Sequence, residues 1–206
     1  TTLSVALTEP TPLNLSSTLA GYIGGQEISC DGANDGSIEL TIIGGVGSTS
    51  FAWTGPNAFV SNGEDQINLE PGTYQVVVSD QNGCSVNSAF TLIAPQPISA
   101  SANIATTSCQ AAATGSIDLT AVGGTLPFTY FWSGPGAFSS ANEDLSALFA
   151  GVYNVTITDA NGCTHTESFD VNEPDLFNIT ATISSYAGGY NVSCAVSSDG
   201  SIDATV

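Results

Sequence analysis

The chain has 206 residues, with 19 Asp and Glu, no Lys or Arg, and a formal net charge of −19. Such a chain has no cations to neutralise phosphate groups, which argues against nucleic acid and against an anionic membrane surface as partners. Its apolar runs are only a few residues long, which argues against direct membrane insertion. Without Lys or Arg the chain has no cleavage site for trypsin-like proteases. Either selection against proteolysis outside the cell or compositional drift in a secreted protein would explain this composition.

Strand-like segments recur along the chain. The segments "SIELTII" (37–43), "TYQVVVS" (73–79) and "NSAFTLI" (87–93) read as strands, the first two with clear two-residue alternation. Gly-Gly, Gly-Pro and Asn-Gly pairs separate them, and no window shows a convincing helical period. Six or seven short strands in about 80 residues predict an all-β fold of immunoglobulin-like β-sandwiches.

A tandem repeat is visible through the cysteines. Cys30 and Cys84 are 54 positions apart, as are Cys109 and Cys163, and an offset of 79 superimposes the two pairs. At that offset, 27 of 66 positions are identical without a gap. Self-similarity at a fixed period defines a repeat array.

The repeat predicts the domain boundaries. We expect four pieces: the last strand of a preceding repeat in 1–10, complete modules in 11–95 and 96–174, and the opening strands of a further repeat in 175–206. Short linkers containing proline, at 95–97 and 173–174, limit backbone freedom between modules. The parent protein is expected to be longer than these residues.

Two aromatic positions recur in each module. "LEPGTY" (69–74) and "LFAGVY" (148–153) place Tyr74 and Tyr153 where a tyrosine corner would stand, with the hydroxyl bonded back to nearby backbone. Trp53 and Trp132 precede a Gly-Pro turn on the third strand. They are predicted to lie in the core, although a role as exposed sugar platforms is the alternative.

The cysteine arithmetic predicts one disulfide within each module, Cys30 with Cys84 and Cys109 with Cys163. Such bonds would join the start of the second strand to the start of the last strand. In the chain-entropy model, each bond would stabilise the folded state by about 4 kcal/mol. The partner of Cys194 would then lie beyond Val206. A bond from Cys84 to Cys109 would instead leave Cys30 and Cys163 without partners. Disulfides indicate an oxidising, extracytoplasmic compartment.

These motifs carry a family resemblance. The set C-x5-G-S-I-x-L, G-G-x-x-P-[FY], W-S-G-P and G-x-Y-x-V-x-[IV]-x-D-x-N-G-C resembles the SprB repeat across essentially the whole chain. One departure is Ser48 in the first module where the second has Pro127. The resemblance implies a very large adhesin on the surface of gliding Bacteroidota, exported by the gliding-associated type IX system.

Several acidic positions are candidates for calcium. The stretch "CDGANDGSIEL" (30–40) resembles part of an EF-hand loop, but Ala33 and Ile42 fall where ligands are required. Turns are the competing interpretation, because Asp and Asn form Asx-turns and Asn-Gly supports hairpins. The recurrent candidates are Asp35 and Asp199 at one turn, and Asp80 and Asp159 in D-x-N-G-C. The acidic pairs 64–65 and 143–144 are expected in solvated loops.

The residues give catalysis little support. The only histidine, His165, replaces Val86 of the first module, so it belongs to no repeated site and is expected on a strand face. No cysteines have metal-ligand spacing. We therefore expect neither an enzyme nor a required cofactor.

Binding and mechanical roles remain. Phe131 should point away from Tyr130 and Trp132, and Ala52 replaces it in the first module, so it is either a polysaccharide contact or a contact between modules. The main hypothesis is a segment of an extracellular cell-surface adhesin filament, with neighbouring repeats and a polysaccharide or abiotic surface as partners. The alternatives are an array of carbohydrate-binding modules on a secreted enzyme and a surface-layer lattice.

Overall fold

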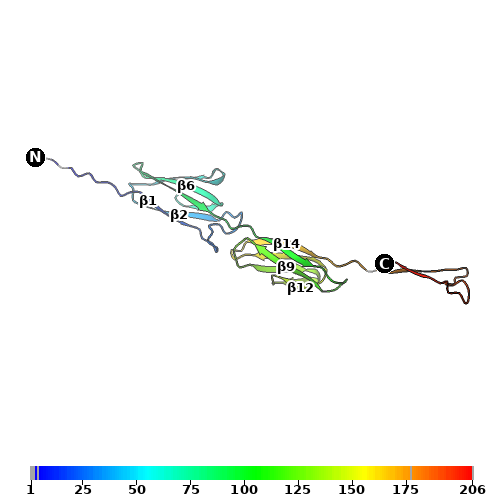
Figure 1. The fold of residues 1–206 in the computed structure, drawn as a ribbon. Helices are drawn as coiled ribbons and strands as arrows, with labels where there is room; N and C mark the ends of the chain where they lie inside the picture. Colours follow the sequence, from blue (N-terminus) through cyan, green and yellow to red (C-terminus); the bar gives the residue numbers. More distant parts are fainter. Residues whose placement is uncertain (1–2, 4, 177, 206) are drawn as a thin grey trace.

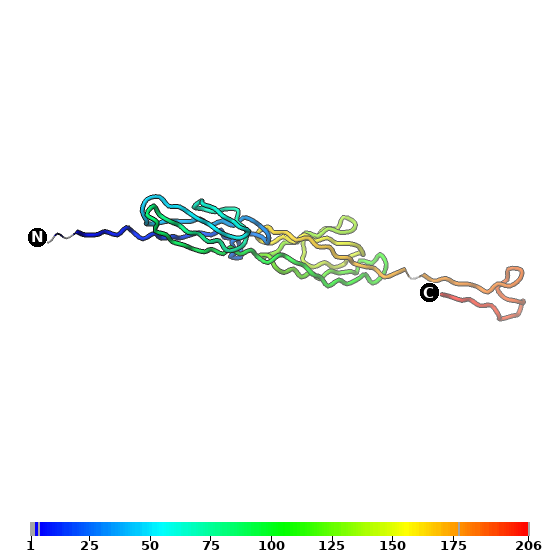
Figure 2. The backbone as a smooth tube through the Cα atoms, turned by 90° about the horizontal axis from the view of Figure 1, so that it is seen from above, coloured from blue at the N-terminus to red at the C-terminus, as the bar shows by residue number. Residues whose placement is uncertain are grey.

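The alternating segments of the sequence form two β-sandwich modules followed by a hairpin (Figure 1). The computed structural model describes residues 3, 5–176 and 178–205. Its two modules lie end to end, and the view from above shows the same elongated arrangement (Figure 2). Among the described residues, no helix is long and apolar enough to cross a membrane.

The first module consists of two antiparallel sheets with the orders β1-β2-β5 and β4-β3-β6-β7. A short 3-10 turn, η1 (Pro56–Ala58), connects β3 to β4. The strands are β1 (Asn14–Leu19), β2 (Gly36–Ile43), β3 (Ser50–Thr54), β4 (Val60–Ser61), β5 (Gln66–Leu69), β6 (Gly72–Ser79) and β7 (Ser85–Leu92).

The second module repeats this topology with the sheet orders β12-β9-β8 and β11-β10-β13-β14. The turn η2 (Pro135–Ala137) occupies the place of η1. A separate hairpin of β15 (Thr180–Ile183) and β16 (Ile202–Thr205) follows. The strands of the second module are β8 (Ser99–Ala105), β9 (Gly115–Val122), β10 (Thr129–Gly134), β11 (Phe138–Ser140), β12 (Leu145–Leu148), β13 (Gly151–Thr158) and β14 (Thr164–Val171).

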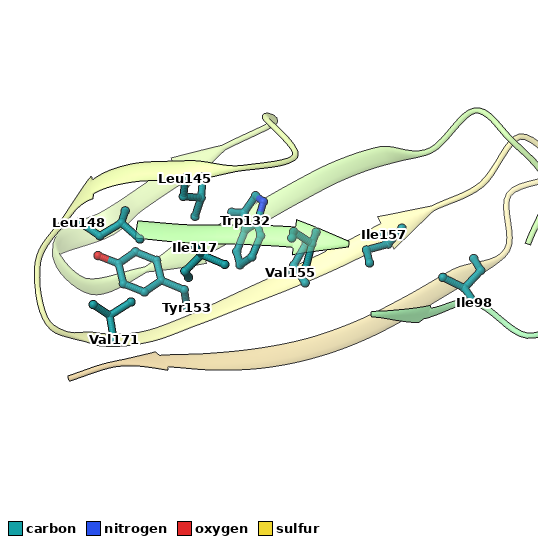
Figure 3. Packing of buried hydrophobic residues seen from close by; sticks show 10 residues of the cluster. Ile98, Ile117, Trp132, Leu145, Leu148, Tyr153, Val155, Ile157 and Val171 are labelled. Carbon is teal, nitrogen blue, oxygen red and sulfur yellow. The ribbon is translucent and has the colours of Figure 1, made fainter. Parts of the chain in front are cut away.

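Each module has its own core between its two sheets. The strand β6 alternates between buried and outward positions, as a sheet with one covered face requires. Figure 3 shows Trp132 at the centre of the second core, with Tyr153 near Leu148 towards one end and Ile98 at the other. Trp53 and Trp132 are 1% and 0% exposed, which excludes them as sugar platforms. Their indole N–H groups donate to the carbonyl oxygens of Gly63 and Asn142, both at 2.9 Å.

The tyrosines make the bond that defines a tyrosine corner. The hydroxyl of Tyr74 donates to the Glu70 carbonyl and that of Tyr153 to the Phe149 carbonyl, each at 3.0 Å. The glycine of the same motif is also explained: Gly151 has φ of +139°, and a Cβ there would lie 2.5 Å from Pro135. A side chain at this position would therefore displace the Gly-Pro turn.

Strand direction fixes where the cysteines lie. In the first module, β2 starts at Gly36, beside Leu92 at the end of β7, and therefore runs opposite to β7. We call the module end where β1 starts upstream and the end where β7 finishes downstream. The residues just before β2 then lie downstream, and the residues just before β7 lie upstream.

The predicted disulfides within modules are wrong for this reason. Cys30 precedes β2 and Cys84 precedes β7, so the length of the eight-residue β7, about 25 Å at roughly 3.3 Å per residue, separates them. A disulfide requires Cα atoms within about 7 Å. The structure instead joins Cys30 to Cys163, and Cys84, Cys109 and Cys194 are free and exposed. The alternative bond between Cys84 and Cys109 is not formed either.

Candidate functional site: the junction between modules

The Cys30–Cys163 disulfide links the downstream end of the first module to the upstream end of the second. Its S–S distance is 2.10 Å, its Cα–Cα distance is 5.6 Å, and its two cysteines are 133 positions apart. Cys163 lies in the turn before β14, as Cys84 lies in the turn before β7. The bond therefore connects non-equivalent cysteines of successive repeats.

An asparagine of the second module binds the first module beside this bond. The side-chain amide of Asn161 donates to the Ile23 carbonyl at 3.0 Å, and its Oδ1 accepts the Ile23 N–H at 3.1 Å. The same Nδ2 lies within hydrogen-bond distance of the Ser29 carbonyl (3.4 Å) and of Thr125 Oγ1 (3.2 Å). Asn161 thus pairs with both backbone groups of Ile23, as a neighbouring strand would.

The turn that carries Asn161 is shaped by one carboxylate. Asp159 Oδ1 accepts the backbone N–H groups of Asn161 and Cys163, and its Oδ2 accepts that of Thr125, all at 2.9 Å. The bond to Asn161 is the Asx-turn expected from the D-x-N-G motif. Asp159 therefore orients both residues that reach across the junction.

The opposing surface is a loop of the first module, residues 20–29, which we call the docking loop. Ile28 anchors the loop because its side chain is fully buried in the first core and its N–H donates to the Ile93 carbonyl at 3.2 Å. At the loop's other side, Tyr22 donates to the Asp35 carbonyl at 3.1 Å. Gly24 has φ of +95°, and a Cβ there would come within 3.0 Å of Thr125 Cγ2. The loop therefore contacts the second module closely enough to favour glycine.

A hollow of about 230 Å³ opens beside the disulfide. The linker 95–97 forms one side, and Asp31, Asp159 and His165 are among the other lining residues. His165 lies on β14, and its Nε2 is 3.5 Å from a Glu167 carboxylate oxygen. Because both Asp159 oxygens already accept amide hydrogens, this carboxylate is engaged in holding the turn.

The four calcium candidates occupy turns and accept hydrogen bonds from the chain. Asp80 reproduces Asp159, with bonds of 2.9 Å from the amides of Asn82, Cys84 and Val46. The carboxylates of Asp35 and Asp199 accept the N–H groups of Ser29 and Ser193, at 3.1 and 3.0 Å. Among the described residues, no three Asp, Glu, His or Cys side chains are grouped as a metal site. The structure thus gives each of these carboxylates a local role in a turn.

The acidic pairs have a role that the sequence analysis missed. Asp65 Oδ1 accepts the Leu40 N–H and Asp144 Oδ1 accepts the Leu119 N–H, both at 2.9 Å, so each bonds to the backbone of a core strand. Glu143 accepts the Tyr130 hydroxyl at 2.9 Å. Burial and this neighbouring carboxylate raise the pKa of Tyr130 to about 12. The recurrence of the pair was the signal that could have predicted a structural role.

Phe131 lies on an exposed sheet face. Its side chain is 61% exposed, and it pairs across β10 and β13 with Thr156. On the same sheet Ser168 donates to Asn154 Oδ1 at 2.7 Å. Phe131 is not among the residues that line the junction hollow.

Comparison with known families identifies the repeat. The SprB repeat family matches the chain twice, at residues 26–58 and 101–137, one match in each module. The chain carries SprB repeats. Both matches include a first cysteine, the G-S-I strand and the tryptophan strand, which are the motifs behind the resemblance seen in the sequence.

Similar solved structures are distant. One, described as "Structural basis for Dscam isoform specificity", has 15% identity and a TM-score of 0.30, covering 67% of this chain and 41% of its own. Another, an amphioxus IgVJ-C2 molecule, has 14% identity and a TM-score of 0.32, and the match covers 80% of this chain and 98% of the amphioxus chain. No curated protein matches the chain.

We predict that Asn161 stabilises the docking of the two SprB repeats. Asn161→Ala removes its paired bonds to Ile23 and should lower the equilibrium constant for forming Cys30–Cys163 against glutathione about tenfold, corresponding to about 1.4 kcal/mol. The fraction of the Cys30–Cys163 peptide, measured by mass spectrometry across a series of glutathione buffers, gives this constant.

The matched control is Asn82→Ala. Asn82 holds the same position in the first repeat but faces no preceding module in this chain, so the constant should not change. Equal effects of the two substitutions would show that the asparagine serves the turn alone.

We further predict that calcium removal leaves the fold unchanged. Since the oxygens of Asp80 and Asp159 accept backbone amides, EDTA and calcium at pH 7 should give the same melting temperature by calorimetry. A rise in melting temperature with calcium, lost in Asp80→Asn, would contradict this role for the carboxylates.

Acid, unlike calcium removal, should lower the melting temperature. Burial of Asp80 favours its neutral form, but the amide bonds from Val46, Cys84 and Asn82 outweigh it and lower the pKa of the carboxyl below its ordinary value. The carboxylate therefore stabilises the fold above the unfolded pKa of about 3.9, and this contribution disappears as the pH falls through the lower folded value. The melting temperature should fall in that range.

Proposed function

We propose that this chain is a segment of an extracellular adhesin filament, in which SprB repeats act as a mechanical stalk on the cell surface. The SprB match supports a repetitive surface protein of this kind, and the disulfide supports an oxidising compartment outside the cytoplasm. The connection to gliding motility comes from the family resemblance. The role is structural rather than catalytic.

The Cys30–Cys163 bond is the observation that carries the mechanical proposal. It joins two modules that already lie end to end, so a load entering at β1 passes from Cys30 through the sulfur atoms to Cys163 and β14. The intervening residues, including β2 to β13, lie off this covalent path. Tension on the ends therefore does not extend most of either core.

Pulling the chain by its ends tests this shielding. Reduction should add about 480 Å of contour length on complete unfolding, because 133 positions of up to about 3.6 Å each join the loaded path. Single-molecule force spectroscopy with and without a reductant measures the difference.

The double variant Cys30→Ser with Cys163→Ser is the control. It should show the longer extension under both conditions. An oxidised wild-type chain that unfolds to its full contour length would contradict the proposed load path.

The exposed face of the second module supports a contact surface for polysaccharide. Phe131 provides a flat apolar ring, and Asn154, Thr156 and Ser168 lie on the two strands of the same sheet that follow. An aromatic ring bordered by hydroxyl and amide groups matches the apolar faces and hydroxyls of a sugar. Such binding would also suit the second candidate function, a carbohydrate-binding array on a secreted enzyme.

Glycan binding distinguishes an adhesive face from a bare stalk. If the face binds sugar, Phe131→Ala should weaken binding about tenfold on a glycan array, equivalent to 1.4 kcal/mol of lost ring contact. Phe149→Ala, which removes another exposed ring, is the matched control and should leave binding unchanged. Ala52→Phe should strengthen binding by placing the ring on the first module. Glycan binding unaffected by all three substitutions would exclude this face.

A further inference from the structure

We infer that Cys30–Cys163 is one instance of a pairing rule, in which the first cysteine of each module bonds to the second cysteine of the next. Cys30 and Cys109 are equivalent first cysteines, as is Cys194, while Cys84 and Cys163 are equivalent second cysteines. The rule assigns a partner to each of the three exposed free thiols. Cys84 would bond to a preceding module, and Cys109 and Cys194 to following ones.

The upstream end of the first module has the geometry that the rule needs. Asp80 holds Asn82 and Cys84 with the same amide bonds, all of 2.9 Å, by which Asp159 holds the residues that cross the junction. Cys84 is exposed at the end facing away from the second module. This turn therefore presents a copy of the surface that docks at the observed junction.

The terminal hairpin reproduces the opposing surface. Its loop, residues 184–193, corresponds to the docking loop. Tyr186 donates to the Asp199 carbonyl at 3.1 Å, and the Ser193 amide donates to the Asp199 carboxylate at 3.0 Å. Tyr22 and Ser29 make the same bonds to Asp35. The loop beside Cys194 is thus already shaped like the one that receives Asn161.

The downstream end of the second module differs from that of the first module in one respect, the length of the segment before its first cysteine. From Pro95 to Cys109 there are 14 positions, against 20 from Pro10 to Cys30, so β8 reaches Cys109 without a long docking loop. The backbone bond that anchors the docking loop is kept, because the Thr107 N–H donates to the Asn172 carbonyl at 3.0 Å as the Ile28 N–H does to the Ile93 carbonyl. A disulfide at Cys109 would therefore hold a junction that has fewer hydrogen bonds.

Overlapping covalent rings follow from the rule. The bond from Cys30 closes a ring that ends at Cys163, and the bond from Cys109 opens the next ring 54 positions before the first one closes. Every backbone bond between the first cysteine of the first ring and the last cysteine of the last ring then lies inside at least one ring. A single proteolytic cut anywhere in that stretch would leave the filament in one piece.

Each bond forms by oxidation of two thiols. The pair loses two protons and two electrons, and a disulfide oxidant such as oxidised glutathione takes them up to become two thiols. The mechanical role of this pairing rests on the proposed filament function. The bond pattern itself can be tested whether or not the filament adheres.

The test uses the chain lengthened by a second copy of residues 11–174, inserted after Pro174 with a specific protease site at that point. After folding in glutathione buffer, we expect a new bond from Cys109 to the inserted copy of Cys84, identified by mass spectrometry after chymotryptic digestion. Cys84→Ser in the first copy removes the ambiguity between copies. Cleavage at the inserted site should leave one species on a non-reducing gel and two after reduction.

With Cys109→Ser in the first copy, cleavage at the inserted site should give two species even without reduction, because the new bond cannot form. Formation of Cys30–Cys163 in both copies serves as the folding control. A free Cys109 in the first copy alongside those bonds, or a bond from that Cys109 to Cys163 of its own module, would overturn the rule. Inserting residues 96–174 alone provides a second design, in which Cys109 should bond to the inserted copy of Cys163.

Discussion

Cys30 and Cys84 precede strands that run in opposite directions, so the sandwich holds them at opposite ends, about one strand length apart. This constraint makes a bond within the module impossible without unfolding it. It also places the first cysteine of one module beside the second cysteine of the next, whenever modules lie end to end. The junction disulfide is therefore a consequence of sandwich topology, and the docking loop and Asn161 hold the two sulfur atoms within reach.

The two covalent connections at the junction are complementary. The linker around Pro95 to Pro97 carries the chain from β7 to β8, while the disulfide joins a loop before β2 to a turn before β14. Either connection alone would allow the modules to pivot about one point. Two separated attachments and the amide of Asn161 restrict that motion, which preserves the end-to-end alignment seen in the structure (Figure 2).

Much of the fold could be predicted because local patterns decide it. Alternating strands, the recurrent tryptophans and the L-x-x-G-x-Y motif each report a contact inside one module, and the structure shows those contacts. The cysteine pairing could not be derived in the same way, because equal spacing in two modules does not reveal the direction of each strand. The role of Asn161 was missed for a related reason: its motif explains a turn completely, and only the docked structure shows the side chain reaching Ile23.

A chain without Lys or Arg must satisfy its carboxylates by other means, and this structure uses the backbone. Asp35, Asp65, Asp80, Asp144 and Asp159 each accept at least one amide N–H, mostly in turns that repeat between modules. Hydrogen bonds from the backbone stabilise an ionised carboxylate without a neighbouring cation. The acidic residues can therefore shape the turns that dock the modules, while the uncompensated negative charge disfavours lateral association of neighbouring chains at low ionic strength. Docking between modules of one chain and repulsion between chains thus arise from the same residue type.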